Sequence, residues 1–340
     1  MSHRPAAADT APKRIHFVSL GCPKNRVDTE VMLGVAKAAG CDLAVEAEDA
    51  DYVVINTCGF IGPAKEESID TILAMGRLKE EGRLDRLIVA GCLSQRYPDE
   101  LAREMPEVDH FLGSSDMLKL GDILHGRGER MMVGNPADYT LRASDPRVLS
   151  QGAHSAYLKI AEGCNRTCSF CVIPTLRGKQ RSRQIPDVVE EAKNAGTYVS
   201  AHLYTDEAIR RAVECGVHSL EHCNLIASET AKLAAKAGAV AVPTLVTYDK
   251  LSSEGASLGF PADSVAKIDN VRLKGLESLA IMKAAGLTMA YGTDLLGEMH
   301  RHQSEEFVIR GRVLGAQEII ASATHIAAKL CRMEGRIGVI

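Results

Sequence analysis

The chain has no tryptophan, and aromatic residues make up only 4% of its 340 residues. Proteins that bind single-stranded nucleic acid stack the bases on aromatic side chains, so this scarcity disfavours a base-stacking surface. The net charge is −4, which leaves no global basic field to attract nucleic acid, although residues 177–183 are locally basic. We therefore expect no direct nucleic-acid binding.

Long hydrophobic runs are also missing. No apolar stretch approaches the ~18 residues that a membrane-spanning helix needs. The first dozen residues (MSHRPAAADTAP) lack the apolar core of a signal peptide and predict a disordered tail over 1–13. We expect a cytoplasmic protein with no membrane association. In such a reducing compartment, the ten cysteines serve metals or catalysis more often than disulfides.

Three of these cysteines form the densest motif in the chain. Cys164, Cys168 and Cys171 lie in a loop rich in Gly, Asn, Thr and Ser that follows a strand-like apolar run at 157–161. Thiolates at such short spacing select zinc, copper or an iron–sulfur cluster. Zinc normally takes a fourth ligand, and no further Cys or His follows within the loop. The motif therefore favours an iron–sulfur cube with one open iron over a closed zinc site.

This spacing, with Phe170 between the last two cysteines, resembles that of the radical S-adenosylmethionine enzymes. The resemblance implies that the three cysteines hold a 4Fe–4S cluster and that S-adenosylmethionine binds the open iron near Phe170. In that superfamily the cluster supplies an electron that cleaves the cofactor to a 5′-deoxyadenosyl radical. The alternatives are three cysteines clustered by chance or a structural metal knuckle.

Three further cysteines recur at one position of a repeating pattern. Each follows a short apolar run, so that the runs 15–20, 52–55 and 87–90 precede Cys22, Cys58 and Cys92. Helical patterns lie between the runs, and strands that alternate with helices predict a parallel α/β sheet. Ligands bind at the carboxyl edge of such a sheet. We expect the three thiols to share that edge, and three unrelated buried cysteines are the alternative.

The motifs around these cysteines are similar to those of the methylthiotransferase family, namely LGCPKNRVDTE, NTCGF and AGCLSQRYP. The resemblance covers about 14–193 and implies that Cys22, Cys58 and Cys92 carry a second 4Fe–4S cluster, which holds or delivers sulfur. The CPKN tetrapeptide and the Val-Asp pair after it resemble the branch that methylthiolates an aspartate of a small-subunit ribosomal protein. A ribosomal protein substrate and an electron donor such as flavodoxin or ferredoxin are thereby implied.

A different alternation of strands and helices begins after about residue 191. Apolar runs end at His202, at His222 and before Asp294, and another spans 240–245, which is the pattern of a β/α barrel. Two His and one Asp at strand ends are a plausible divalent metal site.

The segments YVSAH, HSLEH and YGTD in this part resemble strands five, six and eight of the amidohydrolase superfamily, near imidazolonepropionase and Xaa-Pro dipeptidase. The match runs over about 194–340. It implies that His202 and His222 ligate a metal such as zinc, and that Asp294 is both a ligand and the general base acting on a bound water.

Neither resemblance is complete. The amidohydrolase superfamily also has a His-x-His pair on its first strand and usually a carboxylated lysine on its fourth, and neither occurs upstream here. His300 and His302 have the His-x-His spacing but follow the last strand, so we interpret them as surface or substrate-facing. The methylthiotransferase pattern lacks its later strand–helix units and its terminal β-barrel. We interpret the chain as a chimera joined within 188–196.

The predicted fold class is α/β, with an N-terminal parallel α/β methylthiotransferase domain followed by an incomplete β/α (TIM-type) barrel. The expected parts are a tail at 1–13, the N-terminal domain at 14–131, a linker at 132–154, the start of a radical S-adenosylmethionine barrel at 155–193, and half of an amidohydrolase-like barrel at 194–340. The predicted function is that of a radical methylthiotransferase with two 4Fe–4S clusters. The alternatives are a metal-dependent amidohydrolase acting on small amides or dipeptides, and a fusion in which neither site is complete.

Overall fold

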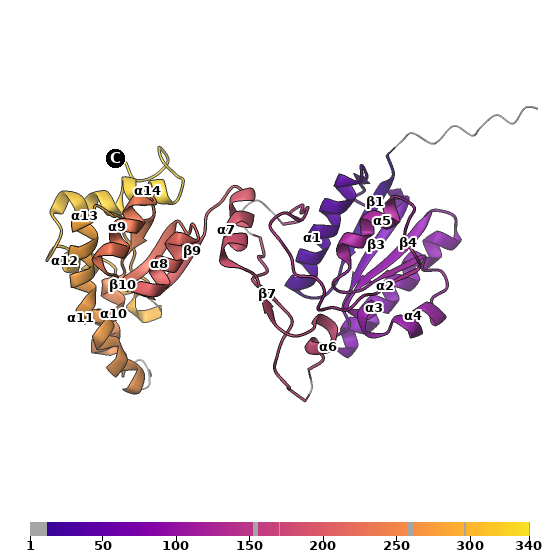
Figure 1. Cartoon of the computed structure of the whole chain (residues 1–340), viewed down its shortest axis with the longest axis horizontal. Coiled ribbons are helices and arrows are strands. Elements are labelled where there is room, and N and C mark those ends of the chain that lie inside the picture. The colour runs from indigo at the N-terminus through magenta and orange to yellow at the C-terminus, as the bar shows by residue number, and fades with distance from the viewer. Residues whose placement is uncertain (1–11, 152–155, 170, 258–261, 296, 340) are drawn as a thin grey trace, which may run out of the picture. The chain divides into compact units, whose positions relative to one another are not determined.

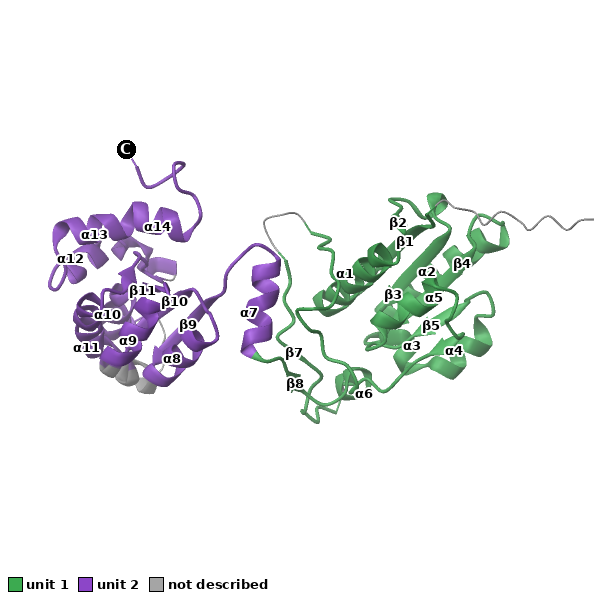
Figure 2. Cartoon of the chain, turned by 45° about the horizontal axis from the view of Figure 1, so that its top comes forward, with its two compact units in different colours: residues 1–184 green, residues 185–340 purple. Residues whose placement is uncertain are grey.

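A computed structural model describes residues 12–151, 156–169, 171–257, 262–295 and 297–339. The chain divides into two compact units, Met1–Gln184 and Ile185–Ile340 (Figure 2). The sequence had suggested a linker at 132–154 and a seam near 194, whereas the division between the units falls between these two positions. Most of the predicted tail, residues 1–11, lies outside the described residues.

Unit 1 is built on a six-stranded sheet with the strand order β2-β1-β3-β4-β5-β6, in which every neighbouring pair is parallel. The predicted parallel α/β architecture is therefore confirmed for this part. Its strands are β1 (Arg14–Ser19), β2 (Asp42–Leu43), β3 (Tyr52–Thr57), β4 (Arg86–Gly91), β5 (His110–Leu112) and β6 (Met131–Met132). Its helices are α1 (Pro23–Ala38), α2 (Gly62–Glu80), α3 (Cys92–Arg96), α4 (Pro98–Glu104) and α5 (Leu120–Leu124), with short 3-10 turns η1 (Ala47–Asp49) and η2 (Met117–Lys119).

The central strands are buried on both faces. Successive side chains of a strand point to opposite faces, so Val54 and Ile88 join the core under α1 and α5, whereas Val53 and Leu87 join the core under α2, α3 and α4. Figure 1 shows α1 and α2 on opposite sides of the sheet. This explains why the runs in the sequence are continuously apolar rather than alternating.

The chain after β6 has no regular structure but is held against α1. The Glu30 carboxylate accepts hydrogen bonds from the Arg147 guanidinium at 2.6 and 3.0 Å, and the Glu30 carbonyl accepts the N–H of Val148 at 2.9 Å. A Cβ on Gly34 would lie 2.6 Å from the carbonyl oxygen of Pro146, so only glycine allows this approach. The described residues of the expected linker therefore belong to unit 1.

The strand expected over 157–161 is wrong in extent. Side-chain donors replace a strand ladder there, because the carbonyl of Lys159 accepts from Arg183 at 2.9 Å and that of Tyr157 from Arg147 at 2.5 Å. Only the last residue of the run enters a strand, and that strand is antiparallel rather than the start of a parallel barrel. The elements around the cysteine loop are β7 (Ala161–Glu162), α6 (Ile173–Arg177) and β8 (Arg181–Ser182).

Unit 2 contains a four-stranded parallel sheet with the order β12-β11-β10-β9. Its strands are β9 (Ser200–Thr205), β10 (Ser219–Leu225), β11 (Val240–Val242) and β12 (Thr288–Met289). Its helices are α7 (Ile185–Asn194), α8 (Asp206–Glu214), α9 (Ser228–Lys236), α10 (Leu245–Glu254), α11 (Ala262–Ala284), α12 (Glu305–Arg310), α13 (Ala316–Ala323) and α14 (His325–Leu330), with the 3-10 segment η3 (Gly297–His302). No sheet of the described strands closes on itself, as expected for an incomplete barrel.

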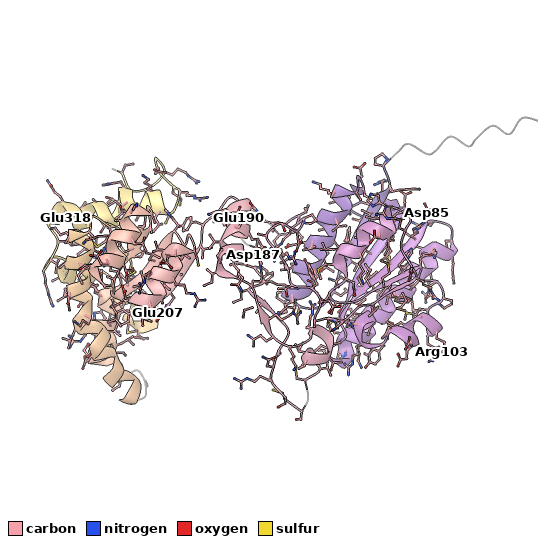
Figure 3. All side chains as sticks on the ribbon, in the orientation of Figure 1. Asp85, Arg103, Asp187, Glu190, Glu207 and Glu318 are labelled. Atoms are coloured by element: carbon pink, nitrogen blue, oxygen red, sulfur yellow. The ribbon has the colours of Figure 1, made fainter. Side chains whose placement is uncertain are left out.

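Polar contacts tie α12 to the sheet of unit 2 and α11 to α13. The fully buried Arg310 pairs with Glu306 of the same helix at 2.7 Å and donates to the carbonyls of Pro243 and Ala290, which follow β11 and β12. On the surface, Glu318 in the first turn of α13, labelled in Figure 3, pairs with Lys283 of α11 at 2.7 Å. Across the described part of the chain, we find no helix whose length and apolarity suit a bilayer crossing.

Candidate cluster and metal sites

The first three cysteines follow neighbouring strands of unit 1. Cys22 comes after β1 and caps α1, Cys58 comes directly after β3, and Cys92 opens α3 directly after β4. Because β1, β3 and β4 are adjacent and parallel, the three residues lie along the carboxyl edge of the sheet, as the sequence suggested. Cys22 is exposed, whereas Cys58 and Cys92 are buried.

Glycines allow the turns that carry these cysteines to approach one another. Gly21 has φ +88°, and a Cβ there would lie 2.8 Å from Cβ and 3.2 Å from Sγ of Cys58. A Cβ on Gly59 would lie 2.6 Å from the carbonyl oxygen of Cys92. Side chains at these two positions would therefore force the cysteine-bearing turns apart.

A buried arginine contacts the sulfur of Cys92. Nη2 of Arg177 donates to Sγ of Cys92 at 3.5 Å and to Oδ1 of Asn25 at 2.6 Å, while Nη1 donates to Asp28 at 2.7 Å. Burial raises the pKa of the Cys92 thiol, and the nearby Arg177 charge opposes that rise. Sequence reasoning missed Asn25, Asp28 and Arg177. The sequence did contain a signal for the first two. Asn25 and Asp28 recur at helical spacing with the apolar Met32, so both polar residues lie on the face of α1 that packs into the core.

Ion pairs around Glu162 hold the segment that precedes the second cysteine loop. The Glu162 carboxylate pairs with Lys159 at 2.6 Å, with Lys24 at 3.2 Å and with Arg177 at 3.3 Å. Lys159 also pairs with Asp28 on α1. Burial by itself would raise the pKa of Glu162, but Lys159 and Arg177 together lower it to about 2. These groups fasten the segment before the loop to α1.

The second set of cysteines lies between β7 and α6. The N–H of Cys164 donates to the carbonyl of Gly178 at 3.1 Å, and the N–H of Cys171 donates to the carbonyl of Cys168 at 3.1 Å, which closes a tight turn. Cys168 is exposed and the other two are half-buried. Phe170, predicted to lie near S-adenosylmethionine, falls outside the described residues.

The cysteines of unit 1 supply the type of ligand that an iron–sulfur cluster requires. Each of the two regions offers three thiols, and thiolates are the ligands that such clusters take. At the sheet edge, Gly21 lies against Cys58 and Gly59 against Cys92, so the turns that carry these thiols approach closely. As the side chains stand in the described residues, no three His, Cys, Asp or Glu groups are gathered as a metal site. Ligation by these cysteines therefore remains a proposal.

In unit 2, the two predicted histidine ligands bind each other. Nε2 of His222 lies 2.8 Å from Nδ1 of His202, and Nδ1 of His222 lies 2.7 Å from Oγ1 of Thr244. The ring of Tyr204 stacks on that of His222 with a centroid distance of 5.2 Å. His222 has φ +73° at an irregularity of β10, which aims its ring at the neighbouring strands.

Burial of His222 disfavours its protonation. Burial, together with the neighbouring His202, lowers the pKa of His222 to about 4, and Asp294 acts in the opposite direction. Asp294 follows β12 with φ +49°, and its carbonyl accepts a hydrogen bond from Thr247 at 3.0 Å. Two nitrogens that are hydrogen-bonded to each other do not both offer a lone pair to a cation. The three groups as placed therefore do not form a ready metal site.

The His-x-His pair after the last strand divides into two environments. His300 is exposed, in agreement with the surface interpretation. The side chain of His302 is only 15% exposed and lies between Glu254 at 2.9 Å and Glu305 at 2.5 Å, so the surface interpretation is wrong for this residue. The two carboxylates, from the end of α10 and the start of α12, hold the ring of His302, a contact that spacing along the sequence did not reveal.

Comparisons with known proteins divide the chain in a similar way. Residues 14–113 match the Uncharacterized protein family UPF0004, and residues 174–340 match the Amidohydrolase family. The N-terminal half is 69% identical over 181 residues to ribosomal protein uS12 methylthiotransferase RimO of Sorangium cellulosum, and 55% identical over 184 residues to that of Myxococcus xanthus. These alignments include 53% and 54% of this chain but only 37% and 39% of the two relatives.

Among solved structures, a prolidase complexed with N-methylphosphonate-L-proline shares 28% identity and a TM-score of 0.45 over 97% of this chain and 76% of that one. The N-terminal half thus resembles RimO, and the family match shows that the C-terminal part resembles the amidohydrolases. Both predicted resemblances are confirmed, and a chimera is consistent with them.

Proposed function

We propose that the N-terminal half is a radical S-adenosylmethionine methylthiotransferase module that binds two 4Fe–4S clusters. The observation that carries this proposal is the position of three cysteines at the ends of three adjacent parallel strands, in a half that is 69% identical to RimO. The proposed ligands of the first cluster are Cys22, Cys58 and Cys92, and those of the second are Cys164, Cys168 and Cys171.

The substrate and partners are part of the same proposal, because the chain covers 37% of its relative from Sorangium cellulosum. The names of the relatives specify ribosomal protein uS12, and we propose an aspartate of that protein as the group that receives the methylthio unit. We further propose a flavodoxin or ferredoxin as electron donor and the cytoplasm as location.

The chain's own residues would hold and orient these groups. When bound, the clusters and S-adenosylmethionine supply the electron, the radical chemistry and the sulfur. Gly21 and Gly59 let the turns that carry Cys58 and Cys92 approach their neighbours closely, and Arg177 places a positive charge beside the Cys92 sulfur. The hydrogen bond from the N–H of Cys164 to the carbonyl of Gly178 holds the first cysteine of the second loop next to the end of α6.

Anaerobic reconstitution with iron and sulfide tests the proposal. We expect about eight irons per chain if both sites hold 4Fe–4S clusters, and formation of 5′-deoxyadenosine from S-adenosylmethionine after reduction. Cys92→Ser and Cys168→Ser should each lose about half of the iron, whereas Cys215→Ser, outside both sets, should lose none. A wild-type chain that binds no iron would overturn the proposal. Iron without 5′-deoxyadenosine would instead indicate a fusion that binds clusters but does not turn over.

A second candidate is a metal-dependent amidohydrolase in unit 2, acting on small amides or dipeptides. It is favoured by the match of residues 174–340 to the Amidohydrolase family, a range that contains His202, His222 and Asp294. Zinc binding would require the hydrogen bond between the two histidine rings to break. Zinc content measured after loading tests this candidate. If His202→Ala leaves the zinc content unchanged relative to wild type, these three residues are not the ligands.

A further inference from the structure

Two consecutive residues of unit 1 contact both sets of cysteines. The side chain of Arg177 reaches Sγ of Cys92 at 3.5 Å, and the carbonyl of Gly178 accepts the N–H of Cys164 at 3.1 Å. Cys92 and Cys164 are far apart in sequence and lie in different local structures. The end of α6 is therefore a direct physical connection between the sheet edge and the second loop.

The surroundings of Arg177 direct its guanidinium to this position. Arg177 is 2% exposed, and its donors are shared among Asp28, Glu162, Asn25 and Cys92. A buried guanidinium is destabilising unless its donors are satisfied, and both terminal nitrogens of Arg177 find acceptors on these four residues. The planar fork lets one nitrogen bind carboxylates while the other faces the amide oxygen and the sulfur, which a lysine could not do.

We propose that Arg177 is a positioning residue for the first cluster, which orients Cys92 as a ligand and raises the reduction potential of the cluster that Cys92 holds. The inference rests on the proposed function. A donor N–H and a positive charge next to a ligating sulfur favour the reduced cluster, because reduction adds negative charge. Since Gly178 also binds Cys164, the same turn couples the position of Arg177 to the fold of the second loop.

The test uses the full chain with Cys164→Ser, Cys168→Ser and Cys171→Ser combined, so that only the first site can load. In this background we compare Arg177→Met, Arg177→Lys and the control Arg181→Met. Arg181 is a half-buried arginine of the same segment that donates to Thr140 at 3.2 Å, to the carbonyl of Pro136 at 2.9 Å and to the carbonyl of Arg177 at 3.4 Å. It thus contacts the same turn, but none of its bonds among the described residues reaches a cysteine sulfur. The midpoint potential of the remaining cluster is measured by redox titration, and iron is counted in parallel.

We expect Arg177→Met to shift the midpoint potential to a more negative value and to lower iron occupancy. Arg177→Lys should give a smaller shift in the same direction, because it keeps the charge and loses the fork, and Arg181→Met should match the background. Circular dichroism identifies folded variants, and if Arg177→Met does not fold, Arg177→Lys decides the question.

Equal potentials in the folded Arg177 variants and the Arg181→Met control would overturn the inference while leaving the proposed function intact. A background that loads no iron, although its three strand-end cysteines are present, would overturn the proposed function and this inference together. The two failures are therefore distinguishable.

Discussion

Nε2 of His222 and Nδ1 of His202 lie 2.8 Å apart, on the neighbouring parallel strands β10 and β9. One ring donates the hydrogen bond and the other accepts it, so the pair is satisfied when His222 is neutral. Burial and His202 lower the pKa of His222 to about 4, which keeps this ring neutral at pH 7. This contact is the starting point for the first prediction.

We expect the His222 ring to titrate near pH 4 in an NMR pH titration. His202→Gln should raise that pKa because it removes a repulsive neighbour, and Asp294→Asn should lower it further because it removes a favourable negative charge. His125→Gln, in unit 1, serves as the control and should leave the His222 titration unchanged. A His222 pKa near the ordinary value of about 6.5 in the wild type would contradict this account.

The ion pairs of Glu162 predict a loss of stability in acid. The folded-state pKa of about 2 lies below the ordinary value of 4.5, so the unfolded chain takes up the proton first as the pH falls. The stabilisation is therefore present above about pH 4.5 and is lost as the pH falls toward 2. Urea unfolding followed by circular dichroism across this range should show the wild type losing its advantage over Glu162→Gln.

At neutral pH, the same Glu162→Gln substitution should destabilise the chain by about 3 to 5 kcal/mol, because it leaves Lys159 and Arg177 buried with one negative charge fewer. Glu104→Gln is the matched control. Glu104 pairs at 2.9 Å with Arg103, an exposed residue labelled in Figure 3, and exposed pairs of this kind contribute little to stability. Equal effects of the two substitutions on the free energy of unfolding would argue against a structural role for the buried cluster.

Substitutions at Gly21 and Gly40 allow the cost of backbone strain to be measured apart from the cost of close packing at the sheet edge. Gly21 and Gly40 both have positive φ, +88° and +82°, but only at Gly21 would a Cβ meet a neighbour, Cys58. We expect Gly21→Ala to lower the free energy of unfolding by about 1 to 3 kcal/mol and to reduce iron loading. Gly40→Ala should cost only the backbone strain, and its iron content should match the wild type. Identical iron contents in the two variants would show that Cys58 does not need this close approach.

The open sheet of unit 2 predicts self-association. Among the described strands, β9 and β12 have a single neighbour each, so each presents one unpaired backbone edge. We expect the apparent mass in size-exclusion chromatography with light scattering to rise with protein concentration between about 1 and 100 µM, the range in which exposed strand edges associate. A mass of 36.6 kDa at every concentration would contradict this expectation.

Local patterns in the sequence determined the order of elements and the position of the strand-end cysteines. The runs before Cys22, Cys58 and Cys92 are short, apolar and followed by helical periodicity, and these properties depend on neighbours within a few residues. Adjacent parallel strands then place their carboxyl ends together whatever the details of packing. In unit 2 the same reasoning found the strands that carry His202 and His222 and the strand before Asp294, but both histidines lie within β9 and β10 rather than at the predicted strand ends.

Only the tertiary structure decided which polar groups meet. Arg177 and Cys92 are 85 residues apart, and Lys159 and Asp28 are 131 apart, so no spacing or periodicity could connect them. The end of the strand predicted over 240–245 also depended on a distant residue. The strand stops after Val242 and α10 begins at Leu245, where the buried Glu306 accepts the N–H of Val246. Buried charges must find partners, and the folded chain supplies those partners from segments that are distant in sequence.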